Sequence, residues 1–383
     1  MIAVKSRYRV VIIGGGVIGT ATAFYLAKSG IRNVAVLEKN YLSSGSTGRC
    51  GGGIRQQWSE RMNVRLAIRS VEHFKRFDSE VGFDIEYNQG GYLLLAYTDE
   101  EVLSFNKNTS MQKEEGLDVE LLSREETAKK FPFINLTDVK AAAYCPSDGH
   151  ANPHLTTFAY ARAAQRMGVD ILTHTSAKRI LTEKGRVTGV LTDRGEIESE
   201  IVVNAAGGYS QEVGEMAGID LPTESYKHQI LVTEPLEHFM DPLVISFEKN
   251  FYIRQTKSGN FIMGQGDKAE LPGHDVTPTW RFLREMTGKM PEFFPFLSDM
   301  RVLRHWAGLY NMSPDGLPII DRSCEIEAFY CAIGFSGHGF MLAPAVGEAV
   351  AEWITYGEPR SVDISNLSIN RFERGFSREK NVV

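Results

Sequence analysis

The sequence predicts an α/β fold in which a parallel, Rossmann-like sheet is combined with a second, β-rich part. Residues 9–39 have the pattern of strand, glycine turn, helix and strand in direct succession. Further glycine-rich segments occur far apart in the chain, at residues 45–53, 205–208 and 334–339. A strand-rich block runs from about residue 226 to 266, where polar and apolar residues partly alternate. Because no repeat or low-complexity linker separates these parts, we expect the second part to be interleaved with the first.

The composition is that of an ordinary globular protein. The chain has 383 residues, of which 43% are hydrophobic and 10% aromatic, enough for a large core and two domains. Its formal net charge is −6, so a nucleic-acid partner has little electrostatic support. No segment resembles a signal peptide or a membrane span, which predicts a cytoplasmic protein and leaves open peripheral membrane attachment through a partner. The four cysteines form no CxxC pair and show no metal-ligand spacing with the nine histidines, so we expect reduced thiols and no metal site.

The first glycine turn is a dinucleotide-binding fingerprint. An apolar run leads into Gly14-Gly15-Gly16-Val17-Ile18-Gly19, and a helical stretch of small residues follows. In such a turn Gly14 permits the tight bend, Gly16 lets a pyrophosphate approach backbone N–H groups at the helix N-terminus, and Gly19 lets the helix pack on the strand. The next strand ends at Glu38, which suits a pair of ribose hydroxyls and would repel a 2′-phosphate.

Three other glycine-rich segments extend this predicted site. The strand that ends at Asn204 continues into Ala205-Ala206-Gly207, and small residues at the carboxyl end of a strand let a ligand approach the backbone closely. The loop at residues 45–53 and the segment at residues 334–339 are also rich in glycine. A fold that gathers all four segments would enclose an extended cofactor from several sides.

These segments together resemble the flavoproteins of the D-amino acid oxidase superfamily, and within it the sarcosine oxidase group. The resemblance covers essentially the whole chain. Besides the first glycine turn with Glu38, the motifs that carry it are Gly45-Ser46-Thr47, Asn204-Ala205-Ala206-Gly207 and Gly334-Phe335-Ser336-Gly337-His338-Gly339-Phe340 with the following Pro344-Ala345-Val346-Gly347-Glu348. The β subunits of dye-linked L-proline dehydrogenases look most similar, at residues 53–57, 226–229, 277–279 and 306–308.

The resemblance implies a glutathione-reductase-type FAD-binding domain made of discontinuous pieces, with an interleaved, β-sheet-rich substrate domain that covers the flavin. The pieces of the FAD domain are expected at residues 1–84, 140–222 and 308–383, and those of the substrate domain at residues 85–139 and 223–307. The residues expected to contact FAD are Gly14, Gly16, Val17, Ile18, Gly19, Glu38, Lys39, Gly45, Ser46, Thr47, Gly51, Gly52, Ile54, Ala177, Ala205, Ala206, Gly207, Gly308, Gly334, Gly337, His338, Gly339, Phe340 and Met341.

Departures from the family's oxidases indicate a dehydrogenase. Monomeric sarcosine oxidases attach FAD to a cysteine where this chain has Gly308, so non-covalent FAD is expected. Those oxidases promote reaction with dioxygen through a lysine where the alignment places Ile262, and an apolar side chain cannot stabilise superoxide charge. Heterotetrameric sarcosine oxidases hold FMN covalently on a histidine where this chain has Pro153, so covalent FMN is not expected, while non-covalent FMN at a subunit junction is left open. The family's lysine ligand of the substrate carboxylate is replaced by Met341, so the contacts to the substrate must differ.

Oxidation of a secondary amine by a flavin requires a C–H bond held over flavin N5, a neutral amine and a charged partner for the substrate carboxylate. Arg55 matches an arginine that binds the carboxylate in the family, and its guanidinium offers a bidentate fork that a lysine lacks. The alternative for Arg55 is a structural salt bridge. His228 and His338 are candidate neighbours of the reacting amine, and Tyr252 and Tyr310 are candidates to line the pocket; ordinary core packing is the alternative for each. Other candidate carboxylate anchors are Lys227, Arg254 and Arg304.

The function predicted from this resemblance is an FAD-dependent dehydrogenase of a secondary or imino amino acid such as L-proline. It would act as the β-type subunit of a complex with an α-type subunit or another electron-transfer partner, and would pass electrons to an acceptor other than dioxygen. Three alternatives are left open. One is a stand-alone sarcosine or D-amino acid oxidase that releases hydrogen peroxide, the second a flavin-carrying assembly subunit without its own chemistry, and the third a nicotinamide dehydrogenase.

Overall fold

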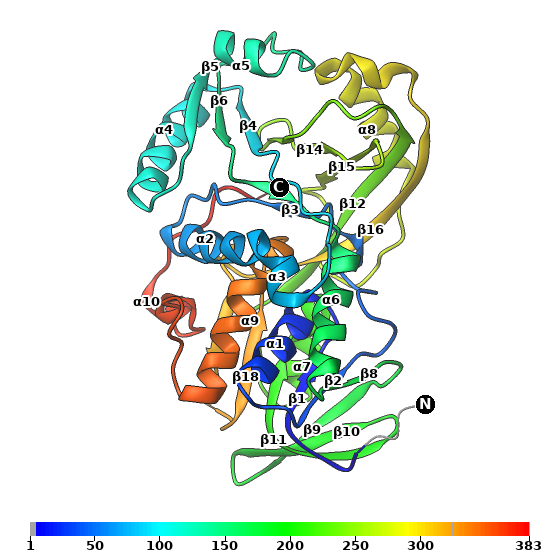
Figure 1. The fold of residues 1–383 in the computed structure, drawn as a ribbon, viewed down its shortest axis with the longest axis vertical. Coiled ribbons are helices and arrows are strands. Elements are labelled where there is room, and N and C mark those ends of the chain that lie inside the picture. Colours follow the sequence, from blue (N-terminus) through cyan, green and yellow to red (C-terminus); the bar gives the residue numbers. More distant parts are fainter. Residues whose placement is uncertain (1–4, 324, 383) are drawn as a thin grey trace.

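The computed structural model describes residues 5–323 and 325–382 and contains two large sheets, which lie at opposite ends of the molecule in Figure 1. The first sheet has the order β17-β18-β11-β1-β2-β8, and β9 and β10 extend it as antiparallel strands beside β11. Its strands are β1 Arg7–Ile13, β2 Val34–Leu37, β8 Asp170–Leu172, β9 Ala177–Glu183, β10 Arg186–Thr192, β11 Gly195–Asn204, β17 Ile319–Arg322 and β18 Phe329–Ile333. The five strands from β18 to β8 run parallel.

The register of the parallel strands brings the glycine-rich segments to one edge. Ile13 pairs with Leu37 on one side and with Asn204 on the other, so the residues that follow these three strands lie side by side. Apart from the exposed Arg7 and Arg9, β1 and β2 are apolar and buried, because other elements cover both faces of the sheet. The edge at which the strands end is therefore the place where a ligand can approach the backbone.

The second sheet is mostly antiparallel, with the order β16-β12-β15-β14-β13-β4-β6-β5. Its strands are β4 Tyr92–Ala96, β5 Glu120–Ser123, β6 Ala141–Cys145, β12 Glu224–Pro235, β13 Leu243–Ser246, β14 Phe251–Gln255, β15 Asn260–Gly266 and β16 Val302–Met312. A small ribbon of β3 Gly53–Ile54 and β7 Gly149–His150 lies between the two sheets.

The strand pairing differs from the expected domain boundaries at two places. β6 belongs to the second sheet, where it pairs with β4 and β5, although the expected FAD piece begins at residue 140. The boundary at residue 308 falls inside β16, which pairs with β12 from Glu224 to Thr233. Both strands are continuous across these points, and the buried run of β6 has no period that would show which sheet it joins.

Helices cover one face of the first sheet, while β9, β10 and one short helix pack on the other face, and further helices pack on the second sheet. The helices are α1 Val17–Lys28, α2 Arg61–Lys75, α3 Phe77–Val81, α4 Asp99–Glu114, α5 Arg124–Lys130, α6 Pro153–Arg166, α7 Ser210–Glu215, α8 Trp280–Phe293, α9 Gly339–Tyr356 and α10 Arg371–Arg374. Short 3₁₀ turns occur at Thr47–Arg49, Gly207–Tyr209, Pro295–Asp299 and Ser365–Leu367. In the described part of the chain, no helix combines the length and the apolar character needed to cross a lipid bilayer.

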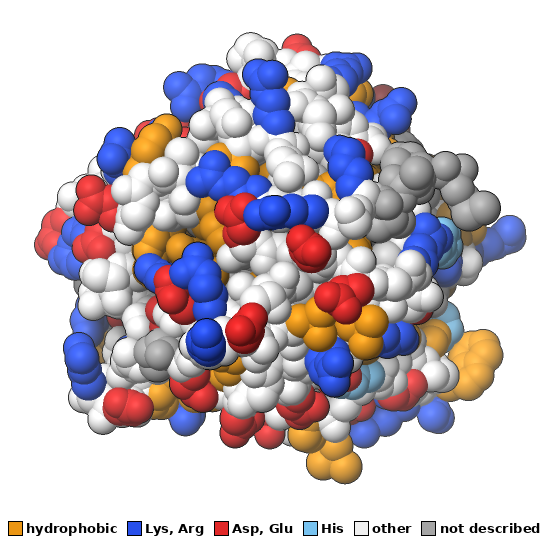
Figure 2. All heavy atoms as spheres, turned by 90° about the horizontal axis from the view of Figure 1, so that it is seen from below, with side chains coloured by type: hydrophobic (Ala, Val, Ile, Leu, Met, Phe, Trp, Pro, Cys, Tyr) orange, Lys and Arg blue, Asp and Glu red, His pale blue; other side chains and the backbone are white. Residues whose placement is uncertain are grey.

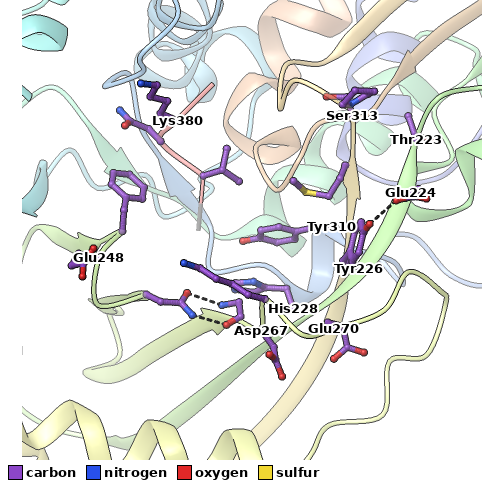
Figure 3. Close-up of a pocket in the computed structure, with 18 of the residues that line it drawn as sticks. Thr223, Glu224, Tyr226, His228, Glu248, Asp267, Glu270, Tyr310, Ser313 and Lys380 are labelled. Atoms are coloured by element: carbon purple, nitrogen blue, oxygen red, sulfur yellow. Dashed lines mark hydrogen bonds between the residues drawn. The ribbon is translucent and has the colours of Figure 1, made fainter. Parts of the chain in front are cut away.

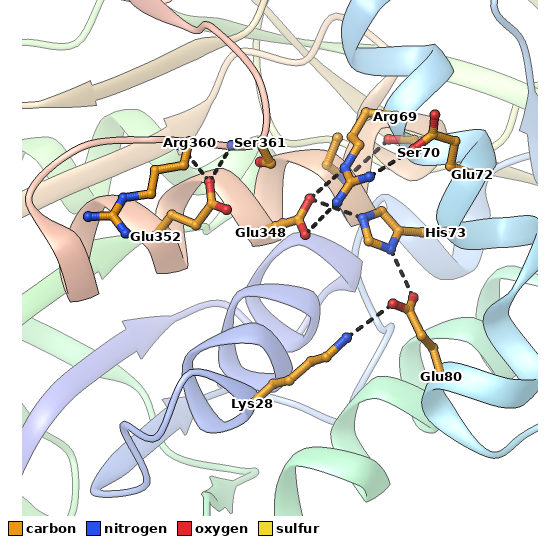
Figure 4. Close-up of polar contacts among 11 residues, drawn as sticks. Lys28, Arg69, Ser70, Glu72, His73, Glu80, Glu348, Glu352, Arg360 and Ser361 are labelled. Carbon is orange, nitrogen blue, oxygen red and sulfur yellow. Dashed lines mark hydrogen bonds and ion pairs between the residues drawn. The ribbon is translucent and has the colours of Figure 1, made fainter.

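A buried polar network ties α1, α2, α3 and α9 together (Figure 4). His73 contacts Glu80 through Nδ1 at 2.9 Å and Glu348 through Nε2 at 3.1 Å. Arg69 donates to both oxygens of Glu348, each at 2.8 Å, and Lys28 donates to Glu80 at 3.0 Å. Burial opposes a charged His73, but its hydrogen bonds to the two glutamates outweigh that effect and raise its pKa. The network fixes the outer sides of α1 and α9, whose N-termini both face the ligand edge.

The surface seen along the long axis of the molecule carries charges of both signs. Figure 2 shows lysine and arginine side chains interspersed with aspartate and glutamate, with apolar side chains between them. Such a mixture gives this face no extended field of one sign.

Candidate active site

A cleft of about 560 Å³ lies where the parallel strands of the first sheet end. The turn between β1 and α1 and the N-terminus of α9 line it from the first sheet, and residues of β12, β14 and β16 close it from the second. The predicted cofactor residues that line it are Gly14, Gly16, Val17, Ile18, Glu38, Lys39, Gly45, Ser46, Thr47, Ala177, Ala205, Ala206, Gly207, Gly308, Gly337, Gly339 and Phe340. The remaining predicted residues, which do not line it, are Gly19, Gly51, Gly52, Ile54, Gly334, His338 and Met341.

The backbone of the first turn leaves no room for side chains. Gly14 has a φ of +120°, and a Cβ there would lie 2.2 Å from the carbonyl oxygen of Ala205. A Cβ at Gly19 would lie 2.0 Å from the carbonyl oxygen of Gly14, so this glycine allows α1 to pack against the turn. The first N–H groups of a helix have no partner within the helix, and α1 and α9 direct two such ends to the cleft. These features fit an extended dinucleotide with a pyrophosphate.

The carboxylate of Glu38 is held at the end of β2 by the neighbouring turns. Its oxygens accept hydrogen bonds from the backbone N–H groups of Gly15 at 2.9 Å and Asn40 at 2.8 Å. It lines the cleft at 9% exposure, so a ligand hydroxyl can reach it only from inside the cleft. This position is the one expected for a ribose-binding acid.

Three rings form the boundary between the two sheets. The ring of His228 stacks on Tyr310, with centroids 4.2 Å apart and planes inclined by 3°, and faces Tyr252 at 5.7 Å. Burial lowers the pKa of His228 to about 3, so its imidazole is neutral near pH 7. Its Nε2 is buried and has no hydrogen-bond partner among the described residues. Burial also raises the pKa of both tyrosines, so their hydroxyls stay protonated.

A second, larger cavity of about 1350 Å³ shares two of these rings with the cleft (Figure 3). His228 and Tyr310 line both cavities. The larger one is also lined by Phe247, by residues 266–268 and by the C-terminal residues 380–382. The rings therefore lie where a molecule in the larger cavity would meet a cofactor in the cleft.

Arg55 is a buried cation with no counterion among the residues that the structure describes. Its side chain is packed between Trp58 and Phe247, with the guanidinium carbon 4.0 and 5.4 Å from the two ring centroids, and the residue is 3% exposed. Nη2 donates to the carbonyl oxygen of Asn381 at 2.5 Å, and Nη1 has no partner among the described residues. No described carboxylate lies within ion-pair distance of Arg55, so the salt bridge considered as an alternative is absent from the described residues. Burial lowers its pKa, which reflects the cost of an unpaired charge.

Arg55 itself lines neither cavity. Two residues that contact it, Phe247 and Asn381, line the larger cavity. His338 also lies outside both cavities: its ring packs on Trp58 at 4.1 Å, and burial, together with the charge of Arg55, lowers its pKa well below the usual range.

Two of the other candidate anchors, Lys227 and Arg254, have partners. Lys227 pairs with Glu270 at 3.2 Å and Asp275 at 2.9 Å. Arg254 is buried and donates from Nε to the carbonyl oxygen of Gly51, which supports the glycine loop beside the cleft. Arg304 and the previously noted Ile262 line neither cavity.

Several residues that line the cleft were not among the predicted cofactor residues. They are Asn40, Ser44, Arg49, Cys50, Thr175, Ser176, Lys178, Tyr209, Glu212, Val276, Leu309, Asn311 and Phe335. Arg49 could have been noticed, because it lies inside the glycine loop; it donates to the carbonyl oxygens of Ser44 and Ala307 and packs against Gly308. Thr175 and Ser176, in the loop after β8, lie in no glycine-rich segment that would have pointed to them.

The described cysteines are free thiols, and one of them lines the cleft. Cys145 and Cys331 are buried, Cys50 lines the cleft, and Cys324 lies outside the described residues. Across residues 5–323 and 325–382, no cluster of three His, Cys, Asp or Glu side chains is arranged to hold a metal ion.

Comparison with known proteins adds independent information. Residues 9–353 match the model of the family described as FAD dependent oxidoreductase. The chain is 35% identical over 377 residues to the sarcosine oxidase subunit beta of Rhizobium meliloti (strain 1021), which covers 97% of this chain and 90% of that protein. It is also similar to the crystal structure of L-proline dehydrogenase from P. horikoshii, with 42% identity, a TM-score of 0.93, and coverage of 98% of this chain and 100% of the other. Glycine oxidase from Bacillus cereus ATCC 14579 is 26% identical, with a TM-score of 0.81 over 92% of this chain and 96% of the other.

Proposed function

The chain belongs to the family of FAD dependent oxidoreductases, and we propose that it is a dehydrogenase for a secondary amino acid of the L-proline type. Sarcosine and proline, named for two of the similar proteins, share a secondary amine one carbon away from a carboxylate. A site for such a molecule needs a cation for the carboxylate and uncharged groups near the amine. The residues around the larger cavity offer both.

The observation that carries this proposal is the buried guanidinium of Arg55, which has no carboxylate partner among residues 5–323 and 325–382. A buried charge without a counterion is costly, and such a group is retained where an anion is to be received. A substrate carboxylate would accept hydrogen bonds from Nη1 and Nη2 together, as a guanidinium fork prefers. Arg55 is in this proposal the group that binds and orients the substrate.

The rings at the boundary would then hold the amine. FAD, when bound, supplies the hydride acceptor. His228 stays neutral at its lowered pKa, so it serves as a hydrogen-bond partner of a neutral amine rather than as a base. Tyr252 and Tyr310 add protonated hydroxyls beside that ring at the boundary of the cleft.

The electron acceptor and the assembly form the second part of the proposal. Gly308 lines the cleft and has no nucleophile, so FAD would be held without a covalent bond. Ile262 in place of a lysine disfavours dioxygen as the acceptor. The full-length similarity to a subunit named beta supports a β-type role beside an α-type subunit, with electrons passing to that partner or to another carrier.

Anaerobic titration of the FAD-loaded chain tests the substrate class. We expect L-proline, hydroxyproline or sarcosine to bleach the flavin absorbance. Pyrrolidine, which has the same ring and amine as proline but lacks the carboxylate, should bleach it at least about 100-fold less effectively because it cannot use Arg55. Absence of bleaching with every secondary amino acid would remove the proposal. Rapid reoxidation in air with release of hydrogen peroxide would favour the stand-alone oxidase instead.

A further inference from the structure

We propose that the C-terminal segment Glu379–Val382 is a lid that occupies Arg55 and competes with the substrate carboxylate for it. The inference rests on the proposed function, because it takes Arg55 as the carboxylate anchor. The segment has no regular secondary structure and ends near the middle of the molecule, between the two sheets (Figure 1). It thus approaches the site from the side that the larger cavity opens.

Glu379 fastens the segment to the start of α2. Its carboxylate accepts hydrogen bonds from the backbone N–H groups of Ser59 at 2.9 Å and Glu60 at 3.1 Å. It also accepts from the Ser59 hydroxyl at 2.5 Å and from Nδ2 of Asn63 at 3.2 Å. A carboxylate at a helix N-terminus is favoured by the helix dipole. These contacts fix Glu379 at the start of α2.

Asn381 occupies the anchor itself. Its carbonyl oxygen accepts from Nη2 of Arg55, while its Nδ2 donates to the carbonyl oxygen of Gln57 at 3.3 Å. Lys380 and Val382, on either side of it, line the larger cavity together with His228 and Tyr310 (Figure 3). The lid therefore lies between Arg55 and the space in which a substrate would be held.

Charge complementarity indicates that this contact gives way to a ligand. A carbonyl oxygen offers partial charge and satisfies one N–H of the guanidinium, and Nη1 is left without a partner among the described residues. A carboxylate offers a full charge and two oxygens, which can satisfy Nη1 and Nη2 together. Asn381 is consequently a weaker occupant of the position that a carboxylate would take.

Truncation after Lys380 tests the competition directly, because it removes Asn381 and keeps the contacts of Glu379 with the start of α2. The probe is cyclopentanecarboxylate, an unreactive ring acid, and its binding is followed by the absorbance of bound FAD. We expect the truncated chain to bind the probe about tenfold more tightly, the equivalent of one hydrogen bond to a charged group. Arg378→Ala, an exposed change just outside the lid, is the control and should leave the affinity unchanged. Unchanged or weaker binding by the truncated chain would overturn the lid.

Trypsin digestion of the full chain gives a second readout that needs neither truncation nor turnover. Release of the lid should expose the Lys380–Asn381 bond, so the probe should accelerate loss of the residues after Lys380, measured by intact mass. The neutral analogue cyclopentanecarboxamide should not do so. If the probe fails to accelerate cleavage, the lid is refuted even when proline bleaches the flavin. If the probe accelerates cleavage but no secondary amino acid bleaches the flavin, the lid stands and the substrate assignment falls.

Discussion

The FAD cleft and the surroundings of Arg55 adjoin the same stacked rings but are built from different parts of the polypeptide. The cleft is shaped by backbone and small residues, whose positions follow from the register of parallel strands. The surroundings of Arg55 are shaped by large side chains and a carbonyl from separate segments, represented by Trp58, Phe247 and Asn381. FAD binding in the cleft should therefore be lost when a side-chain atom is added to its backbone. Substrate binding beside Arg55 should instead depend on charge.

The largest effect is expected from Gly14→Ala, which tests the backbone side of this comparison. The new Cβ would lie 2.2 Å from a backbone oxygen at a φ of +120°, so the turn must shift and FAD binding should be lost. The measurement is flavin absorbance per mole of folded protein. Gly30→Ala is the matched control, since its φ is +94° but nothing lies within 4 Å of the new Cβ. If Gly14→Ala retained full FAD, the cleft would not depend on this turn.

Arg55→Met tests the side-chain side and should leave FAD content unchanged. Loss of the guanidinium should raise KM for the amino acid by about 100-fold or more, because a charged hydrogen-bond partner of the carboxylate is removed. Arg55→Lys should restore only part of this loss, since an ammonium lacks the planar fork. Arg65→Met, an exposed change on α2, is the control. An unchanged KM in Arg55→Met would make Arg55 a structural residue.

The same contrast explains what could be predicted from the sequence. The fold class and a dinucleotide site follow from glycine spacing, because a strand, a glycine turn and a helix determine where the backbone is open, whereas FAD followed from the resemblance of several motifs to a family. The neutral state of His228 and the contact of Asn381 with Arg55 could not be predicted, because they depend on burial and on residues more than 300 positions apart. The domain boundary expected at residue 308 stays a prediction, and the sequence did not show that residue 308, which lines the cleft, lies within a strand of the second sheet.

His73→Gln tests the polar network between α2, α3 and α9, because the stability that this network contributes depends on pH. The raised pKa of His73 means that its contribution to stability is fully present below pH 6.5 and is lost as the pH rises through the folded value. Hydrogen bonds from His73 lower the pKa of Glu80 to about 2. Burial would raise the pKa of Glu348, but hydrogen bonds from His73 and Arg69 outweigh it and lower that pKa to about 2. The contribution of these two carboxylates to stability is therefore lost as the pH falls from 4.5 toward 2. At any pH between 4.5 and 6.5, the unfolding free energy of the variant should therefore be about 2 kcal/mol lower than that of the unaltered chain, and the difference should be smaller outside that window.

Urea unfolding across this pH range measures the effect of His73→Gln. His238→Gln, which removes a surface contact to Asp241, is the control and should change the unfolding free energy by under about 1 kcal/mol. A loss that is the same at every pH would show that His73 acts through packing rather than through its charge.

The smallest effect is expected at the boundary itself, from Tyr252→Phe. The position of the ring is set by packing, since a Cβ at Gly264 would lie 2.3 Å from the tyrosine oxygen and one at Gly51 3.0 Å from the ring. Phenylalanine should therefore keep the ring in place and retain FAD, while loss of one neutral hydrogen bond to the substrate should lower kcat/KM about fivefold. Tyr144→Phe on β6, away from both cavities, is the control. If Tyr252→Phe released FAD, the hydroxyl would belong to the architecture of the cleft, and the division between a backbone-built cofactor site and a side-chain-built substrate site would fail where the two meet.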